Sequence, residues 1–311
     1  MSQQNVDKSV DEKKPKAVAL LSGGLDSSLA VRMMLEQGVE IEAVAIKTPF
    51  CDFDCGKGCG HRVKEVADEL GIKLKTVYFG EEYLRMLKKP KYGYGSGMNP
   101  CIDCRAMMYN AANETGMEGK VLRPLSAKNL PPTDAEKSGL VKRENMGEIK
   151  GRSRKGQLVM AKHFGIAEPP NAAGGCLLTD PAFSKRVEDI MERFDDIPSL
   201  NDIELLKVGR HFRLTPDAKL VVGRNKDENE MIKALVTEGD IMIEAKDHVG
   251  PTCILRGKHD DAMVATCAAI ALRYSDAPKD SESKVRVTID GSEREVITSP
   301  ADSSLADAIR I

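Results

Sequence analysis

Short apolar runs alternate with segments of helical periodicity along the first eighty residues. Residues 17–21 and 43–46 are apolar runs of strand length, and residues 72–78 alternate apolar and polar positions. Between these stretches, residues 27–37 and 61–70 carry apolar side chains at helical spacing, and each ends at or next to a glycine. This order predicts an α/β fold with a doubly wound parallel sheet and right-handed crossovers.

The pattern loosens after residue 79 and becomes regular again further along. A helix is expected over residues 103–113, whereas the proline-, lysine- and arginine-rich segment 123–157 is expected to be mostly irregular. Asp180-Pro181 predicts the start of another helix, because a capping carboxylate precedes a first-turn proline. Strand-like and helix-like stretches then alternate beyond residue 199 and predict a smaller α+β domain. They lie at 211–214, 220–223, 228–235, 240–244, 253–256 and 262–274.

These patterns divide the chain into four expected parts. Residues 1–16 form a flexible arm, residues 17–199 the α/β domain, and residues 200–275 the smaller domain. Residues 276–311 are expected to be a charged linker and a hairpin tail that turns at Asp290-Gly291.

Composition excludes several classes of protein. The 46 lysines and arginines nearly balance 48 acidic residues, which excludes a histone-like polycation but leaves room for a local basic patch. No apolar run approaches the roughly 18 residues of a membrane span, so no membrane is expected as a partner. Residues 1–16 lack the apolar core of a secretory signal, and we therefore expect a cytoplasmic protein. Clustered cysteines among the eight are then interpreted first as metal, cluster or redox sites.

A glycine-rich turn, Ser22-Gly-Gly-Leu-Asp-Ser-Ser28, joins the first predicted strand to the first helix. Gly23 and Gly24 allow the backbone to approach an anion closely, and the helix start offers unpaired N–H groups. The hydroxyls of Ser22, Ser27 and Ser28 are candidate phosphate donors, and Asp26 is a candidate ligand for Mg²⁺. The alternative is a turn whose serines only cap a helix.

This string resembles the PP-loop of the ATP pyrophosphatases, which cleave ATP between the α and β phosphates and have an adenine nucleotide alpha hydrolase-like fold. The resemblance implies that ATP adenylates a substrate oxygen. It also implies that five loop residues grip the departing pyrophosphate, namely Ser22, Gly23, Gly24, Asp26 and Ser27.

Two further segments carry candidate sulfur chemistry. Asn99-Pro-Cys-Ile-Asp-Cys104 has a Cys-x-x-Cys spacing, and Cys176 lies in the glycine-containing stretch 174–178. Three thiolates suit a 4Fe-4S cluster with one open iron, and thiolate-rich sites otherwise select zinc. Buried thiols are the plainer alternative.

Together with the phosphate loop, this pattern resembles the tRNA thiolation enzymes, of the 2-thiouridine and 4-thiouridine synthase type. The resemblance implies that Cys104 and Cys176 occupy the two sulfur-handling, catalytic positions. Cys101 occupies the place of an aspartate that can also ligate a cluster. In the cluster-dependent thiolases the open iron carries hydrosulfide to the adenylated base. A persulfide on Cys176, resolved by Cys104, is the cluster-free alternative.

The other cysteines divide into a loop group and a core pair. Cys51, Cys55, Cys59 and His61 could complete a tetrahedral Zn²⁺ site, with relay thiols or inert loop cysteines as the alternatives. Cys253 and Cys267 lie in apolar stretches and are interpreted as small core residues.

Basic residues are concentrated in residues 142–155, where phosphate contacts would supply sequence-independent affinity for a nucleic acid. The candidates are Lys142, Arg143, Arg152, Arg154 and Lys155, and a solvated charged loop is the alternative.

Three short segments, 209–213, 222–225 and 249–256, resemble the RNA-binding module of the NFACT proteins of ribosome quality control. The resemblance implies a small α+β RNA-binding fold. Its candidate contacts are Arg210, Arg213, Arg224, Asn225 and Arg256, because arginine forks suit phosphates and stacked bases. The alternative is that these arginines tie the two domains together.

The sequence thus predicts an ATP-dependent tRNA sulfurtransferase that adenylates a uridine carbonyl and replaces its oxygen with sulfur. The sulfur donor is left open among free sulfide, a cysteine desulfurase and a sulfur carrier, and a homodimer is one option for the oligomeric state. Two rival functions remain: a PP-loop amide ligase or small-molecule sulfurtransferase, and a degenerate PP-loop protein that only binds RNA. One departure favours the last, since residues 110–119 lack the apolar strand that usually follows the cysteine helix, and only the run 121–124 could replace it.

Overall fold

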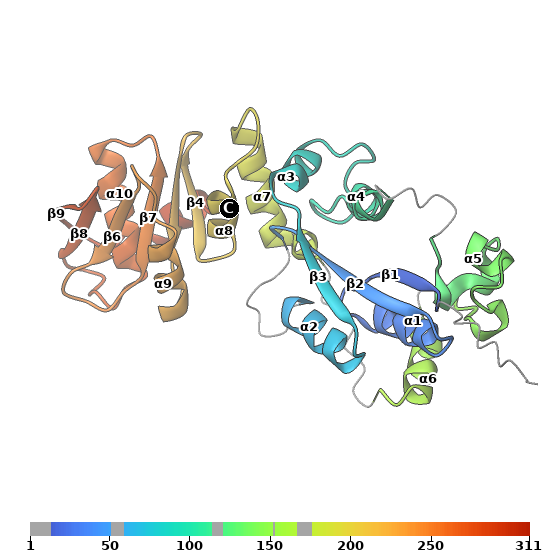
Figure 1. Cartoon of the computed structure of the whole chain (residues 1–311). Coiled ribbons are helices and arrows are strands. Elements are labelled where there is room, and N and C mark those ends of the chain that lie inside the picture. Colours follow the sequence, from blue (N-terminus) through green and yellow to red (C-terminus); the bar gives the residue numbers. More distant parts are fainter. Residues whose placement is uncertain (1–13, 51–58, 114–120, 152, 167–175) are drawn as a thin grey trace, which may run out of the picture. The chain divides into compact units, whose positions relative to one another are not determined.

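The protein is described here by a computed structural model. The model describes five stretches of the chain, residues 14–50, 59–113, 121–151, 153–166 and 176–311, without the side chains of 59–62 and 111–113 (Figure 1). Its contacts divide the chain into two compact units. We call residues 1–79 with 104–175 the first unit, and residues 80–103 with 176–311 the second unit. The boundary expected near Ser199 falls inside the second unit.

A three-stranded parallel sheet forms the first unit, in the order β1 (Lys16–Leu20), β2 (Glu40–Lys47) and β3 (Lys73–Tyr78). Two helices, α1 (Leu25–Leu35) and α2 (Cys59–Glu69), form the crossovers. Right-handed crossovers between strands in this order place both helices on one face of the sheet. The buried side chains of that face pack against both helices. The predicted α/β fold with a parallel sheet is confirmed.

The opposite face of this sheet is amphipathic. Near the starts of the strands it carries cross-strand ion pairs, Lys16 with Glu40 at 3.2 Å and Lys73 with Glu42 at 4.0 Å. Val18, which pairs with Glu42, is 53% exposed. Within the apolar run 17–21, Ala17 and Val18 are exposed, Ala19 and Leu20 are half-buried, and Leu21 is buried.

The rest of the first unit is built from short elements. They are η1 (Pro124–Asn129), α5 (Asp134–Lys137), η2 (Arg143–Asn145), α6 (Lys155–His163) and α4 (Cys101–Asn113), whose first three residues belong to the second unit. Leu125 and Ala127 of η1 and Ala161 of α6 pack in the same core as α1. The segment 123–157 is mostly irregular, as predicted, but α6 begins within it. Residues 121–123 form no strand.

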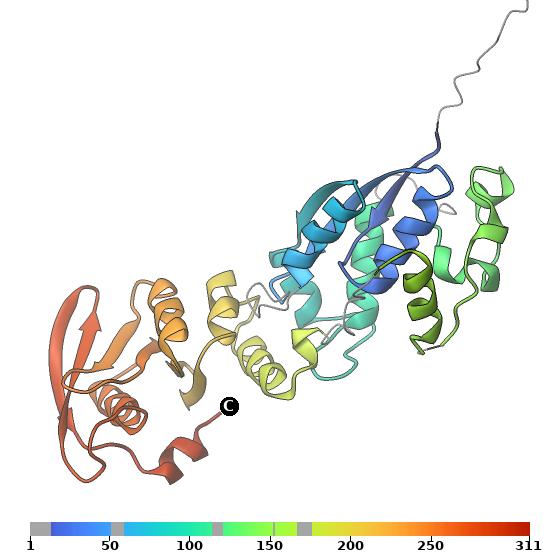
Figure 2. The ribbon, with the colours of Figure 1, turned by 90° about the horizontal axis from the view of Figure 1, so that it is seen from below.

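A six-stranded antiparallel sheet dominates the second unit, in the order β4-β5-β7-β6-β8-β9. The strands are β4 (Arg210–Thr215), β5 (Ala218–Val222), β6 (Ile241–Ala245), β7 (Thr252–Gly257), β8 (Ser283–Ile289) and β9 (Ser292–Thr298). Helix α10 (Asp261–Arg273) packs on one face, and α8 (Leu200–Leu206) and α9 (Lys226–Ala234) pack on the other (Figure 2). The predicted α+β domain is confirmed.

Local signals fixed several boundaries in this unit. Asp180 accepts a hydrogen bond from the Phe183 N–H at 2.8 Å and caps α7 (Pro181–Arg193). The β8–β9 hairpin turns at Asp290 and Gly291, whose φ angles are 47° and 81°. Helices α3 (Glu81–Lys88), α8 and α11 (Ser303–Ala308) were not predicted. In the described residues, no helix is long and apolar enough to cross a membrane.

The two edges of the six-stranded sheet differ. The β4 edge is lined by the last residues of the chain, since the Arg213 N–H donates to the Ile309 carbonyl at 2.8 Å and the Ile311 N–H to the His211 carbonyl at 3.0 Å. The β9 edge presents three exposed charged side chains in succession, Glu293, Arg294 and Glu295.

Three cations lie in a row across the sheet, directly opposite one another on β4, β5 and β7. Arg213 pairs with Lys219, and Lys219 pairs with Arg256. Like charges in such positions destabilise a sheet unless they are compensated. Asp189 of α7 accepts hydrogen bonds from the Arg213 guanidinium and lies 3.9 Å from the Lys219 ammonium. We call Arg213, Lys219 and Arg256 the cation row.

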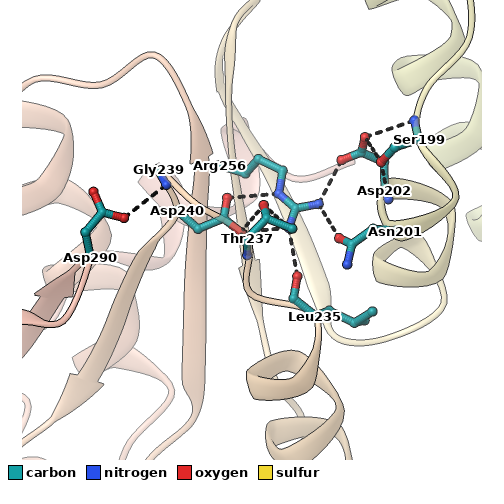
Figure 3. A network of polar contacts seen from close by, with 9 residues as sticks. All are labelled: Ser199, Asn201, Asp202, Leu235, Thr237, Gly239, Asp240, Arg256 and Asp290. Atoms are coloured by element: carbon teal, nitrogen blue, oxygen red, sulfur yellow. Dashed lines mark hydrogen bonds and ion pairs between the residues drawn. The ribbon is translucent and has the colours of Figure 1, made fainter.

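Arg256 has the most complete set of partners in the row (Figure 3). Its guanidinium donates to Asp240 at 2.7 and 2.9 Å, to Asp202 of α8 at 2.8 Å and to Asn201 at 2.9 Å. Another of its N–H groups reaches the Leu235 carbonyl at 2.9 Å. The Asp240 side chain is only 3% exposed. Arg256 therefore neutralises carboxylates from two separate segments and fastens α8 to the sheet.

Lys219, in the middle of the row, has weaker compensation. Its ammonium is buried and, within the described residues, has no hydrogen-bond partner. Burial lowers the pKa of Lys219 to about 7, against a smaller opposing effect of Asp189. Burial and the charge of Lys219 also lower the pKa of His211 well below its usual value. The middle position of the row thus loses much of its charge near neutral pH.

Replacing Arg256 with Met is expected to destabilise the second unit by about 3–5 kcal/mol, because two buried carboxylates lose their counter-ion. Urea unfolding measures this. Lys258→Met removes an exposed pair with Asp217 and is the control, with an expected loss below about 1 kcal/mol. A loss of similar size in the two variants would contradict the structural role of Arg256.

Lys219 also makes stability depend on pH. Its pKa of about 7 in the folded chain lies below the value of 10.5 for the unfolded chain, so the unfolded state binds more protons between these limits. The free energy of unfolding of the wild-type protein, minus that of the Lys219→Met variant, is therefore expected to rise by about 1–2 kcal/mol between pH 6.5 and 8.5. Urea unfolding of both proteins over this range measures the difference. A pH-independent difference would show that Lys219 keeps its ordinary pKa.

Candidate functional site

The phosphate-loop candidate lies in the first unit, between the end of β1 and the start of α1. Gly24 is the N-cap residue of α1, and no side chain caps this helix start. The hydroxyls of Ser22 and Ser27 lie 3.1 Å apart, and the Ser27 hydroxyl donates to the Gly24 carbonyl at 2.9 Å. An uncapped helix start leaves backbone N–H groups available to an anion. The arrangement fits phosphate binding.

Gly23 is required by its conformation and by close packing. Its φ is +74°, and a β-carbon there would lie 3.0 Å from the backbone nitrogen of Val63 in α2. The loop is thereby pressed against α2. This packing leaves no room for a larger residue.

The remaining loop residues differ in exposure. Ser22 and Asp26 are exposed, as an anion-binding hydroxyl and a metal-binding carboxylate must be. Ser28 is only 7% exposed, and its hydroxyl donates to the Gly24 carbonyl at 3.0 Å. Ser28 therefore braces the first turn of α1, and its contact with phosphate stays a prediction.

In the second unit, the turn before Cys101 is hydrogen-bonded to the turn after Cys176. The Met98 N–H donates to the Leu178 carbonyl at 3.1 Å, and the Ser184 hydroxyl donates to the same carbonyl at 2.6 Å. Cys101 lies three residues after Met98, and Cys176 lies two residues before Leu178. The backbone therefore brings the Cys101 turn and the Cys176 turn together. We call these joined segments, residues 97–101 and 176–184, the cysteine turns.

Asn99 belongs to the candidate site, although the sequence indicated it only as the first residue of an Asn-Pro turn. It is 8% exposed, and its side-chain amide donates to the Cys101 sulfur at 3.2 Å. An N–H group directed at sulfur stabilises thiolate charge and tunes a metal-bound thiolate. Cys101 itself is exposed and Cys104 half-buried, three residues apart on one face of α4.

The cysteine turns are fastened to the rest of the second unit. Asp103 accepts hydrogen bonds from the N–H groups of Lys91 and Tyr92, both at 3.0 Å. Arg85 of α3 binds Asp196 at 2.7 Å, and Lys88 donates to the Phe194 carbonyl. These contacts explain why residues 80–103 belong with α7 and the six-stranded sheet.

The predicted metal sites are only partly within the described residues. Among those residues, no group of three or more cysteine, histidine or acidic side chains lies close enough to hold a metal ion. Cys104 belongs to the first unit, and Cys101 and Cys176 to the second. Cys51 and Cys55 lie outside the described residues, and of Cys59 and His61 only the backbone, in the first turn of α2, is described. Both sites stay predictions.

The core pair of cysteines is confirmed. Cys253 and Cys267 are fully buried between the sheet and α10. Burial raises the pKa of Cys267 to about 12 and that of Cys253 well above its usual value. Neither is a candidate nucleophile.

The basic segment begins at the far end of α1. The Lys142 N–H donates to the side chain of Gln37, just beyond the C-terminus of that helix, at 2.7 Å. The Arg143 guanidinium is already engaged within the protein, because it donates to Glu136 at 2.5 Å and to the Leu130 carbonyl at 2.7 Å. Lys142 and Lys155 are exposed and Arg154 is half-buried, while Arg152 lies outside the described residues.

Three of the five arginine and asparagine candidates of the second unit line one pocket of about 490 Å³, namely Arg210, Arg224 and Asn225. Tyr274 also lines it, and the Arg210 guanidinium lies 4.7 Å from the centre of the Tyr274 ring. We call this the β4–β5 pocket. Arg213 and Arg256 lie instead in the cation row, so their contact with RNA stays a prediction and their observed role is structural.

Two family models match the chain. The model described as "tRNA methyl transferase HUP domain" matches residues 15–118, and the model described as "NFACT protein RNA binding domain" matches residues 209–305. Both resemblances inferred from the sequence are confirmed at the level of these domains. The second match contains the whole six-stranded sheet, β8 and β9 included.

Curated relatives resemble parts of the chain. A probable tRNA sulfurtransferase of Methanothermobacter thermautotrophicus is 26% identical over 219 residues, which are 64% of this chain and 54% of that protein. The tRNA-specific 2-thiouridylase MnmA of Natranaerobius thermophilus is 30% identical over 103 residues, 29% of this chain and 28% of that protein. The chain thus spans about half, or less, of the length of these relatives.

Among solved structures, the U34-tRNA thiolase NcsA from Methanococcus maripaludis with its 4Fe-4S cluster aligns with 58% of this chain and 66% of its own. The TM-score is 0.35 and the identity 15%.

Gly97 offers a test of the cysteine turns. A β-carbon there would lie 2.6 Å from the Leu178 carbonyl oxygen and closer still to the Ser184 hydroxyl, whereas one at Gly93 would meet nothing within 4 Å. Both glycines have positive φ, 59° and 74°, so the cost of that conformation is common to both. Gly97→Ala is expected to destabilise the second unit by about 1–3 kcal/mol more than Gly93→Ala in urea unfolding. Equal losses would show that the two turns are not tightly joined.

Proposed function

We propose that this protein is an ATP-dependent tRNA sulfurtransferase that converts a uridine of tRNA into a thiouridine. The observation that carries the proposal is a combination within one chain. An uncapped, glycine-rich helix start suited to phosphate lies in the part that matches the HUP domain. Cys176, one of the two candidate sulfur-handling cysteines, belongs to the same compact unit as the sheet that matches an RNA-binding domain, and Cys104 belongs to the unit of the phosphate loop.

The first half-reaction belongs to the phosphate loop. The carbonyl oxygen of the uridine attacks the α-phosphorus of ATP, a new oxygen–phosphorus bond forms, and pyrophosphate leaves. Backbone N–H groups at the start of α1 and the hydroxyls of Ser22 and Ser27 would bind the leaving pyrophosphate, and Asp26 would hold Mg²⁺. Adenylation turns the oxygen into part of AMP, which is a good leaving group.

In the second half-reaction, sulfur bonds to the activated carbon of the base and AMP departs with the former carbonyl oxygen. Free sulfide, a cysteine desulfurase or a sulfur carrier would supply the sulfur. In the cluster-free route, a cysteine desulfurase transfers sulfane sulfur to Cys176, and the outer sulfur of the resulting persulfide attacks the carbon. Cys104 then attacks Cys176, forms a disulfide and releases the sulfur as the thiouridine, and a thiol reductant restores the two cysteines.

A 4Fe-4S cluster is the other candidate carrier of sulfur, although the described residues contain no group of three cysteine, histidine or acidic side chains arranged to hold a metal. The donor set would be the three thiols of Cys101, Cys104 and Cys176, and the Asn99 amide at 3.2 Å from the Cys101 sulfur is the kind of hydrogen bond that such thiolates accept. When bound, a cluster held by three cysteines supplies one open iron that binds sulfide. The role of Asn99 is then to orient and stabilise the Cys101 thiolate.

One observation favours a second candidate function, RNA binding without turnover. Between α4 and η1 the described residues, 121–123, run as an irregular stretch. Among these residues the strand that would help to hold adenosine in PP-loop enzymes has no counterpart. Release of pyrophosphate from ATP in the presence of tRNA separates the two functions. It also distinguishes both from an amide ligase or small-molecule sulfurtransferase, which would not depend on tRNA.

Replacing Cys176 with Ala is expected to abolish formation of the thiolated nucleoside and to leave the affinity for tRNA unchanged within about twofold. The sulfur-transferring thiol is lost, whereas the RNA-binding sheet is not altered. Nucleoside analysis of tRNA from cells with each variant, and binding of purified protein to tRNA, measure the two properties. Cys267→Ala is the control, because that thiol is buried in the core and takes no part. Normal thiolation by the Cys176→Ala variant would defeat the proposal.

A further inference from the structure

The β4–β5 pocket has the size and the wall chemistry of a site for a single nucleotide. Its volume of about 490 Å³ falls within the range of small-ligand sites. The start of β4, the turn between β5 and α9 and the loop between β6 and β7 line the pocket, and these three parts lie in the segments that resemble the RNA-binding module. Helix α9, Tyr274 and Asp276 complete the lining. Val249, 79% exposed, adds an apolar rim, whereas Pro251 lines the pocket as a buried residue.

Most charged side chains of the pocket already have partners. Arg224 binds Glu228, and Lys233 lies 3.4 Å from Glu244. Among the described residues, no carboxylate pairs with Arg210 or Lys226, so these two cations remain available to a ligand. Such a pair of cations favours a ligand that bears negative charge.

Arg210 is held in a way that favours stacking. Its guanidinium carbon lies 4.7 Å from the centre of the Tyr274 ring, and its one hydrogen bond to the described residues is a long one, 3.4 Å, to the Gly223 carbonyl. The planar group is thus kept at the wall of the pocket by an aromatic ring rather than by a carboxylate. Guanidinium planes so held are surfaces on which unpaired RNA bases stack.

We propose that the β4–β5 pocket takes one unstacked nucleotide of the bound RNA. Its base stacks on Arg210 and contacts the rim at Val249, and its phosphate lies near Lys226. Base-paired RNA has no such base to offer, so the pocket selects a loop, a bulge or a single-stranded end. The inference rests on the proposed function, in which the RNA is tRNA. It adds a site at which the protein distinguishes unpaired from base-paired nucleotides.

Arg210→Lys tests the stacking, because it keeps the positive charge and removes the plane. The variant is expected to bind tRNA, and a single-stranded RNA oligonucleotide of mixed sequence, about 5- to 150-fold more weakly. The slope of affinity against salt concentration is expected to stay the same, since the number of phosphate charges neutralised is unchanged. Binding is measured by fluorescence anisotropy at several salt concentrations, with the full chain, and the unfolding midpoint is measured beside it.

Arg294→Lys is the matched control. Arg294 lies on β9 in an exposed pair with Asp261, remote in the strand order from β4, and its replacement is expected to change affinity less than twofold. Arg210→Gln, which also removes the charge, is expected to lower the salt slope by about one as well as the affinity.

Two results would overturn the inference. Wild-type affinity in Arg210→Lys, for both RNAs, would show that no base stacks there. Displacement of the RNA by micromolar concentrations of free nucleoside monophosphates would show a small-molecule site instead. Failure of the wild-type protein to bind tRNA would contradict the proposed function, and the oligonucleotide then tests the pocket by itself.

Discussion

Three cations on neighbouring strands, Arg213, Lys219 and Arg256, set the main constraint on the second unit. They would repel one another if the sheet stood alone, and the carboxylates that compensate them come from elsewhere in the chain. Asp189 belongs to α7 and Asp202 to α8. The two helices must therefore lie where these carboxylates meet the row. The packing of α7 and α8 on the sheet follows from charge as well as from apolar burial.

The position of α7, which the cation row constrains, also determines where the cysteine turns lie. Helix α7 starts five residues after Cys176, and Ser184 in its first turn accepts a hydrogen bond from the Met98 N–H. A fixed α7 gives the cysteine turns a fixed place relative to the β4–β5 pocket, since all of them belong to one compact unit. Under the proposed function, the second unit contributes the β4–β5 pocket, Cys101 and Cys176. The first unit contributes the phosphate loop and Cys104.

Sequence reasoning succeeded where a signal is local. Asp180 and Pro181 define a helix start, and Asp290-Gly291 a hairpin turn, because the conformation of each depends on the residues themselves. It failed where a partner is distant. Arg256 was taken for an RNA contact, and no local pattern shows that Asp202, 54 residues away, would neutralise it. The exposure of Val18 was equally hidden, since it depends on whether any element covers that face of the sheet.

The site was predictable to a similar extent. The phosphate loop lies at a strand–helix junction as expected, because glycines and a helix start specify it locally. Asn99 was visible in the sequence, but its contact with the Cys101 sulfur was not, because an Asn-Pro turn has many uses. Tyr274 is the last helix-like position before a charged stretch, and only the fold places it under Arg210. A contact between an arginine and an aromatic ring that are distant in sequence produces no periodic pattern from which it could be predicted.

The way the six-stranded sheet ends bears on how copies of this protein can associate. An unprotected strand edge is a template for pairing with another chain, and it invites aggregation. Here the backbone of residues 309–311 occupies the β4 edge, and consecutive charges of alternating sign stand along β9. Neither border of this sheet is therefore suited to strand addition. Extension of the six-stranded sheet from one subunit into another is disfavoured, and contacts between two copies of this sheet would have to use side-chain surfaces instead.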